Sequence, residues 1–99
     1  MIRHIVMFTL NGQTQEEKNA QILEVATRLE GLVGVVPGLR TMNVYANVVD
    51  VPGNHDITLV AHFDDEEALR GYLTHPAHVE VAEYIGSIRT DRAAIDIDL

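Results

Sequence analysis

The stretch IRHIVMFTL, residues 2–10, is predicted to form a β-strand, in which successive side chains point to opposite faces. Both faces of this strand carry apolar side chains. Val6 and Phe8 fall on one face together with His4, and Ile5 and Met7 fall on the other. A strand that is apolar on both sides needs cover on both sides. We therefore expect residues 2–10 to lie inside a sheet that is packed on each face.

The next part of the chain predicts a helix and two further strands. The capping box Thr14-x-x-Glu17 precedes apolar residues at helical spacing, among them Leu23 and Leu29, which predicts a helix over residues 15–33. Pro37-Gly38 breaks the chain before a strand over residues 39–48. After the turn at 52–54, residues 55–63 alternate as a third strand, with apolar side chains on one face.

The C-terminal part predicts two helices and a last strand. Asp64-x-x-Glu67 is expected to cap a short helix that reaches Tyr72. A second helix begins at Pro76 and is expected to bury Val79 and Ala82, with Ile85 and Ile88 as further candidates. Residues 92–99 alternate as a strand, for which we expect Ala93, Ile95, Ile97 and Leu99 inside and Asp96 and Asp98 outside.

This order of elements predicts an α+β fold, the ferredoxin-like βαββαβ arrangement with a four-stranded antiparallel sheet and its helices on one face. The other sheet face is left open, and an apolar open face typically marks an interface. We expect a homodimer that packs sheet against sheet. A ligand pocket between the sheet and the helices is the alternative use of these apolar surfaces, and the two can coexist.

Composition limits the classes of partner. With 99 residues the chain is expected to form a single domain, residues 1–99. Seven Lys and Arg against fifteen Asp and Glu give a net charge of −8, which disfavours nucleic acid and anionic membranes as partners. The absence of cysteine and of a long apolar segment favours a cytoplasmic protein. No glycine-rich phosphate loop or Gly-x-Ser-x-Gly motif is present.

The motif Tyr72-Leu73-Thr74-His75-Pro76-Ala77-His78 carries most of the information about function. Pro76 ends one helix and starts the next, so His75 is expected at the capping position and His78 in the first turn. Free amides and the positive end of the helix dipole disfavour a protonated imidazole there. A neutral His78 could accept a proton at neutral pH.

This motif, the start Met1-Ile2-Arg3-His4-Ile5-Val6-Met7-Phe8 and the turn Pro37-Gly38-Leu39 resemble the stress-responsive dimeric α/β-barrel (Dabb) family over nearly the whole chain. The resemblance implies a ferredoxin-like subunit and a dimer whose two sheets form a barrel. The family includes plant cyclases of the olivetolic acid cyclase type, which close a poly-β-ketone by an intramolecular aldol reaction without a metal or organic cofactor.

By this resemblance His78 is the general base, Tyr72 assists proton movement, and His4 lines the cavity. We add Val60 and Leu69 to the expected substrate-binding residues, although neither matches the family's cavity residues closely. We expect no cofactor and no metal, since helical spacing does not carry across the proline break between His75 and His78. The expected ligand is a small apolar carbonyl compound.

Other interpretations of the same residues remain open. His75, His78 and Tyr72 could serve only to hold the helix junction and the core, and His4 could be a hydrogen-bonded core residue. The protein would then be a non-catalytic, stress-related oligomer or a small-molecule binding protein. A cofactor-free monooxygenase of the kind found on similar dimeric barrels is a third alternative, by analogy of fold only.

Overall fold

The computed structural model describes residues 1–99 and contains four strands and three helices. The elements, in chain order, are β1 Ile2–Leu10, α1 Gln15–Glu30, β2 Leu39–Ala46, β3 Ile57–Phe63, α2 Glu66–Thr74, α3 Pro76–Ile88 and β4 Arg89–Asp98. The strands form one antiparallel sheet in the order β2-β3-β1-β4, which confirms the predicted ferredoxin-like fold. The two helices predicted on either side of the break at Pro76 are present as α2 and α3.

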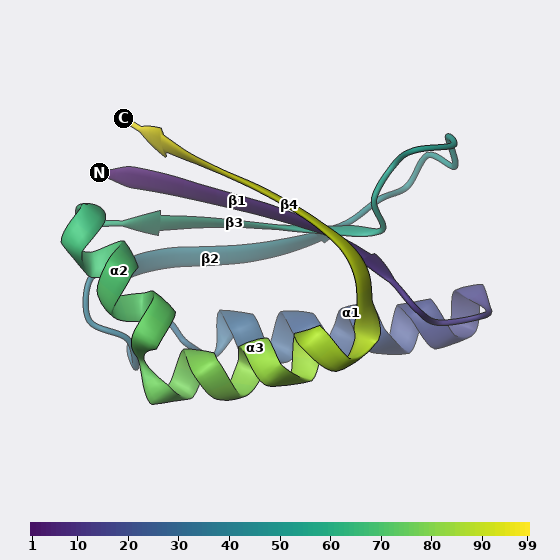
Figure 1. The fold of residues 1–99 in the computed structure, drawn as a ribbon, viewed down its shortest axis with the longest axis horizontal. Coiled ribbons are helices and arrows are strands. Elements are labelled where there is room, and N and C mark those ends of the chain that lie inside the picture. The colour runs from purple at the N-terminus through teal and green to yellow at the C-terminus, as the bar shows by residue number, and fades with distance from the viewer.

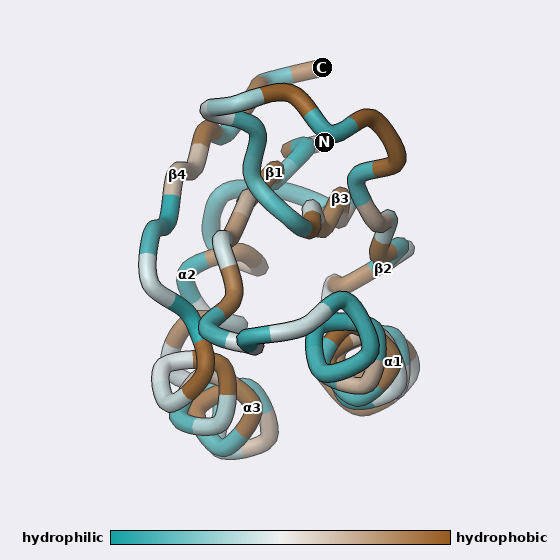
Figure 2. The backbone as a smooth tube through the Cα atoms, turned by 90° about the vertical axis from the view of Figure 1, so that its right-hand side faces the viewer, coloured by the Kyte–Doolittle hydropathy of each residue, from teal (hydrophilic) through white to brown (hydrophobic).

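All three helices lie on the same side of the sheet (Figure 1). Viewed end-on, the sheet curves over α1 and α3, and its other side carries no helix (Figure 2). The core lies between these two layers and is a single cluster of 17 buried apolar residues. Strand β3 shows the predicted alternation, since Ile57, Leu59, Ala61 and Phe63 are all buried. From α1, Val25 and Leu29 reach this core, whereas Leu23 is 69% exposed.

A glycine turn joins α1 to β2 and packs against α2. Gly38 has a φ of 80°, a backbone conformation that disfavours every residue with a Cβ. A Cβ at this position would lie 2.5 Å from the Cβ of Ala68 in α2. The Pro37-Gly38 break is therefore needed for the turn and for the close approach of α2.

Two details of the C-terminal helices differ from the sequence prediction. The cap of α2 is Asp65, whose side chain accepts from the Ala68 amide, because Asp64 forms an ion pair with Arg40. In α3 the buried residues are Val81 and Ile85, while Val79 is 40% exposed. The prediction is wrong for Val79 and Ala82, which are exposed, whereas Ile85 is buried and Ile88 packs against the core as expected.

The orientation predicted for the last strand is wrong relative to the helices. Asp96 pairs with His4 and Ala94 pairs with Val6, so these residues share the helix-covered face. Ile95 and Ile97 pair with Ile5 and Arg3 and lie on the open face. The alternation itself was recognised correctly, but alternation does not state which face of a strand meets the helices.

Candidate functional site

A pocket of about 160 Å³ lies between the helix-covered face of the sheet and the two C-terminal helices. Its walls come from β1, β3, α1, α2, α3 and β4, so residues from almost the whole chain meet there. Most of the lining is apolar. The lining residues are His4, Val6, Phe8, Leu29, Leu59, Tyr72, Leu73, His78, Ala82, Ile85, Gly86, Arg89 and Arg92.

The helix junction holds His78 at this pocket. His75 is the C-cap of α2 and the N-cap of α3, and its Nδ1 accepts from the Ala77 amide at 3.1 Å. Pro76 takes the first position of α3, where the missing amide hydrogen costs nothing. His78 follows in the first turn, as predicted, and points back toward Tyr72 at the end of α2.

Four aromatic rings pack together at the wall of the pocket. The rings of Tyr72 and His78 are 3.9 Å apart between centroids and tilted by 35°, close to a stacked arrangement. Tyr72 also contacts Phe63, at 4.9 Å between centroids, and His4, at 6.2 Å. Since Tyr72 is only 1% exposed, its ring is fixed by these contacts.

The environment keeps His78 neutral and Tyr72 protonated. Burial lowers the pKa of His78, whereas a hydrogen bond to the Leu73 backbone raises it. Charge interactions with His4, Arg92 and His75 lower the pKa further. Burial also raises the pKa of Tyr72. The Nδ1 atom of His78 is buried and has no hydrogen-bond partner in the chain. The pocket thus contains a neutral imidazole nitrogen without a partner, beside a phenol that keeps its proton.

His4 is held by a carboxylate that the sequence did not point to. Its Nδ1 lies 2.5 Å from Oδ1 of Asp96, and the His4 side chain is 6% exposed against 47% for Asp96. A carboxylate accepts a hydrogen bond, so Nδ1 of His4 carries a proton. In the neutral ring Nε2 is then the free acceptor.

The structure brings together three of the five predicted site residues. His4, Tyr72 and His78 line one pocket, whereas Val60 and Leu69 do not line it. Val60 pairs with Ile5 on the open face of the sheet. Leu69 is buried in α2 and lines a different pocket, of about 410 Å³, next to Asp96 and Asp98.

Sequence reasoning missed three polar residues at this site: Asp96, Arg89 and Arg92. Asp96 is 92 positions from His4 along the chain, so no local pattern could pair them. Arg89 and Arg92 give no signal in the sequence, because the seven basic residues are spread from Arg3 to Arg92 without a run. The alternation of Asp96 and Asp98 was the only available signal, and it was assigned to the wrong face.

Two further features, metal-binding groups and membrane-spanning helices, bear on the class of the protein. No group of three or more His, Asp or Glu side chains is arranged to hold a metal ion. None of the three helices is both long and apolar enough to span a membrane.

Comparison with known proteins identifies the family. The sequence model described as Stress responsive A/B Barrel Domain matches residues 2–99, so the chain belongs to this family. An uncharacterised protein of Streptomyces coelicolor is 35% identical over 78 residues, which is 79% of each chain.

Solved structures agree with this assignment. A dimeric ferredoxin-like protein of unknown function from Bacteroides fragilis has a TM-score of 0.85 and 28% identity, covering 99% of this chain and 95% of its own. A dimeric ferredoxin-like protein from Thermobifida fusca has a TM-score of 0.80 and 31% identity, covering 99% of this chain and 90% of its own.

Two proteins with named activities share the fold alone. A cofactor-independent oxygenase from Streptomyces nogalater has a TM-score of 0.74 and 16% identity, with coverage of 99% and 91%. A hydroxynitrile lyase from Passiflora edulis has a TM-score of 0.78 and 14% identity, with coverage of 99% and 92%.

Proposed function

We propose that this member of the stress-responsive A/B barrel family is a cofactor-independent enzyme that removes a proton next to the carbonyl group of a small, mostly apolar compound. The observation that carries this proposal is the unpaired, buried Nδ1 of His78, stacked against Tyr72 in an apolar pocket. A buried polar atom without a partner is costly, and sites that tolerate one often use it for chemistry.

The proposed reaction needs only proton transfers and one carbon–carbon bond. His78 takes the proton as the α C–H bond breaks, and the electron pair becomes an enolate. Tyr72, which keeps its own proton, donates a hydrogen bond to the enolate oxygen. The enolate carbon then attacks a second carbonyl of the same molecule, and the new alkoxide takes the proton from His78. Atoms and electrons balance without an oxidant or a cofactor.

The His4–Asp96 pair supports this arrangement from β1 and β4. Asp96 fixes the orientation of the His4 ring, as second partners of catalytic histidines commonly do. His4 contacts Tyr72 edge to face at 6.2 Å and therefore limits where the phenol can move. We assign His4 the role of a positioning residue that also lines the pocket.

Cavity size restricts the substrate. A cavity of about 150 Å³ lined by apolar side chains accommodates one benzene molecule. At about 160 Å³, the pocket of this protein therefore has room for one ring or a short chain. The proposal accordingly concerns small carbonyl compounds, and a cyclase or related lyase of the olivetolic acid cyclase type is its cyclising form.

Proteins of this fold support more than one reaction. The two neighbours named as a cofactor-independent oxygenase and a hydroxynitrile lyase show that enzymes occur on this scaffold. Their identity to this chain is too low to transfer a reaction, so the argument for proton abstraction comes from the pocket alone.

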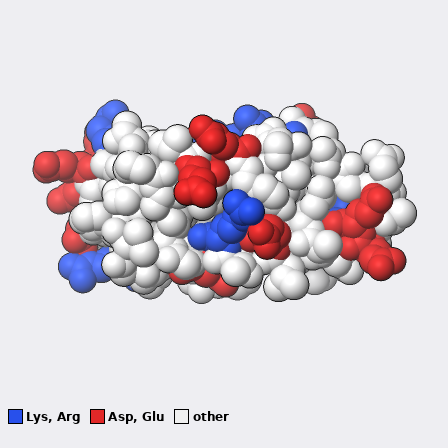
Figure 3. Space-filling view, turned by 90° about the horizontal axis from the view of Figure 1, so that it is seen from below, with Lys and Arg blue, Asp and Glu red and all other residues white.

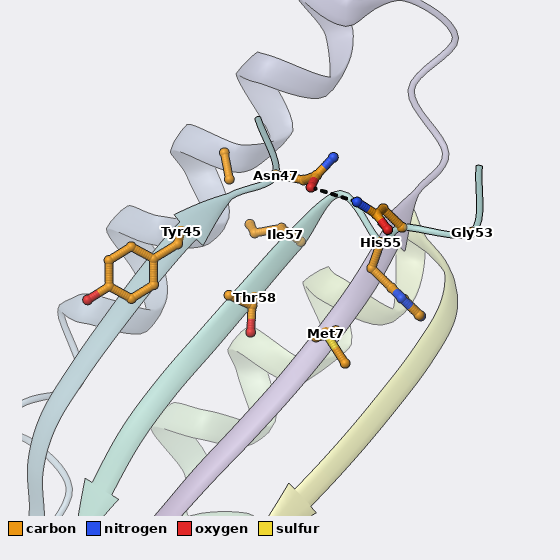
Figure 4. A pocket seen from close by; sticks show the side chains of 9 residues that line it. Met7, Tyr45, Asn47, Gly53, His55, Ile57 and Thr58 are labelled. Atoms are coloured by element: carbon orange, nitrogen blue, oxygen red, sulfur yellow. Dashed lines mark hydrogen bonds between the residues drawn. The ribbon is translucent and has the colours of Figure 1, made fainter. Parts of the chain in front are cut away.

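We also propose that the protein works as a homodimer through the open face of the sheet. This face carries Met7 and Ile95, which are 38% and 59% exposed in the single chain, next to Ile5, Val60 and Ile97. Tyr45, Thr58 and Met7 lie side by side on neighbouring strands, on the side away from the helices (Figure 4). No acidic side chain lies in the central rows of this face. A stable dimer buries about 800 Å² per subunit, which a face of this kind can supply.

Deuterium exchange into small ketones tests the proposed chemistry without knowledge of the natural substrate. Cyclohexanone and acetophenone are incubated with the protein in D₂O, and loss of the α-proton signals is followed by NMR. We expect catalysed exchange that falls by about 100-fold or more in His78→Gln, since a positioned general base typically contributes 10²–10⁴-fold. Tyr72→Phe should lower it to a smaller extent.

His55→Gln is the matched control, because it removes an imidazole that does not line this pocket. It should exchange α-protons at the wild-type rate. Exchange that is absent in the wild type, or unchanged in a folded His78→Gln variant, would contradict the proposed function.

A further inference from the structure

The charge lining the pocket is opposite in sign to the charge of the protein. The chain has a net charge of −8, yet the lining contains Arg89 and Arg92 and no Asp or Glu. Asp96, the acidic residue bonded to His4, does not line the pocket. On the helix-covered side of the molecule, by contrast, acidic and basic groups are interspersed (Figure 3). The pocket is therefore a local basic site in an acidic protein.

An irregularity between β1 and β4 places both arginines on the same face. Arg92 pairs with Phe8 and Arg89 pairs with Leu10, with a shift of register between the two pairs. Residues three apart on a regular strand point to opposite faces. The bulge-like shift turns Arg89 to the helix-covered face as well, and such irregularities commonly redirect side chains next to functional sites.

Neither of these arginines has a partner in the chain. The other five basic side chains each form an ion pair or a side-chain hydrogen bond: Arg3 with His62, Lys18 with Asp56, Arg28 with Glu24, Arg40 with Asp64 and Arg70 with Glu66. Arg89 and Arg92 form neither. Two unpaired guanidinium groups at one pocket leave their hydrogen-bond donors available to a ligand.

We propose that Arg92, assisted by Arg89, binds a carboxylate group of the substrate, so that the pocket takes ring-sized or short-chain keto acids. This inference rests on the proposed function for the carbonyl part, but the binding of the carboxylate is a separate property. A guanidinium offers two parallel donors that match the two oxygens of a carboxylate. The apolar remainder of the ligand enters the pocket toward Phe8, Ile85 and His78.

Benzoate and benzamide are the probes, because they share size and shape but differ in charge. Binding is followed by NMR titration of the wild-type protein and of Arg92→Gln, Arg89→Gln and Arg70→Gln. We expect the wild type to bind benzoate about tenfold or more tightly than benzamide, and Arg92→Gln to lose about tenfold of benzoate affinity, the size of one charge-assisted hydrogen bond. Arg89→Gln should show a smaller loss.

Arg70→Gln is the control for net charge, because Arg70 lies in α2 outside this pocket and pairs with Glu66. It should bind benzoate like the wild type. Arg92→Lys keeps the charge but not the planar pair of donors, and it should lie between the wild type and Arg92→Gln. Equal binding of benzoate and benzamide to the wild type, or equal loss in Arg70→Gln and Arg92→Gln, would overturn the inference.

A second readout separates this inference from the proposed function. Exchange of neutral cyclohexanone should depend on His78, and Arg70→Gln, which changes the net charge outside the pocket, should exchange at the wild-type rate. If the protein catalyses no exchange but still binds benzoate more tightly in the wild type than in Arg92→Gln, the carboxylate site stands and the proposed reaction falls. If exchange requires His78 but the wild type and Arg92→Gln bind benzoate equally tightly, the reaction stands and the carboxylate site falls.

Discussion

Replacing Asp96 with alanine removes the only partner of the buried Nδ1 of His4. The two atoms are 2.5 Å apart, and the His4 side chain is 6% exposed. After the change the Nδ1–H group has no acceptor in the chain, and water must reach it through the space that the carboxylate leaves.

The size of the effect follows from burial of the donor and exposure of the acceptor. Leaving a buried donor without a partner costs about 1–3 kcal/mol. Because the Asp96 side chain is 47% exposed, solvent already weakens the pair and can enter after the substitution. We therefore expect the free energy of unfolding to fall by about 1–1.5 kcal/mol, from the lower half of that range.

Thermal unfolding at fixed protein concentration measures this change. For a domain of this size about 1 kcal/mol corresponds to 4–8 °C in the melting temperature, so Asp96→Ala should melt about 5–10 °C below the wild type. Asp98→Ala is the matched control, since Asp98 lies two residues further on the same face of β4 and pairs with Ile2. It should change the melting temperature by less than about 3 °C, the range of surface substitutions.

The tautomer of His4 gives an independent measurement. In the wild type, nitrogen NMR should place a proton on Nδ1 of His4, because a carboxylate faces that atom. In Asp96→Ala the neutral ring should distribute its proton between both nitrogens. Equal melting temperatures for the two aspartate variants, together with an unchanged His4 tautomer, would refute the role assigned to the pair.

Three further predictions follow from the geometry. The pKa of His78 is lowered in the folded state, so the unfolded chain binds the proton more readily. The free energy of unfolding should therefore be highest above about pH 6.5 and fall as the pH drops below this value. Urea unfolding at several pH values measures this dependence, which should be weaker in His78→Gln. Gly86 and Gly71 both have open space where a Cβ would lie, so a change of either to alanine should stabilise its helix by about 0.5–1 kcal/mol. Only Gly86 lines the pocket, so only Gly86→Ala should reduce ketone exchange. Met7→Glu on the open face should halve the mass seen in light scattering, whereas Leu23→Glu on the exposed side of α1 should leave it unchanged; an unaltered mass for Met7→Glu would contradict the sheet-to-sheet dimer.

The sequence predicts those parts of the fold that depend on local rules. The capping box at Thr14 and Glu17 is present, with both of its hydrogen bonds, because its chemistry is complete within four residues. The break at Pro76, with His75 as the cap, follows from the missing amide hydrogen of proline in the same way.

The parts that the sequence does not predict depend on distant pairing. Which face of β4 meets the helices is decided by its register with β1, since a shift by one residue exchanges the two faces. Ala93, Ile95 and Ile97 look like a core stripe because they are apolar, but they lie on the open face, where Ile95 is 59% exposed in the single chain. Asp96 was therefore expected outside and instead holds His4.

The register of β4 thus sets two surfaces at once. One set of alternating residues carries Asp96 to His4 and Arg92 to the pocket, and the other carries Ile95 and Ile97 to the open face. A slip by one residue would place charged groups in the proposed dimer interface and isoleucines beside His4. Because both errors would occur together, dimer formation and a correctly built pocket should be gained or lost together in variants that disturb the β1–β4 pairing. Substitutions in α3 that leave this pairing intact should affect the pocket alone.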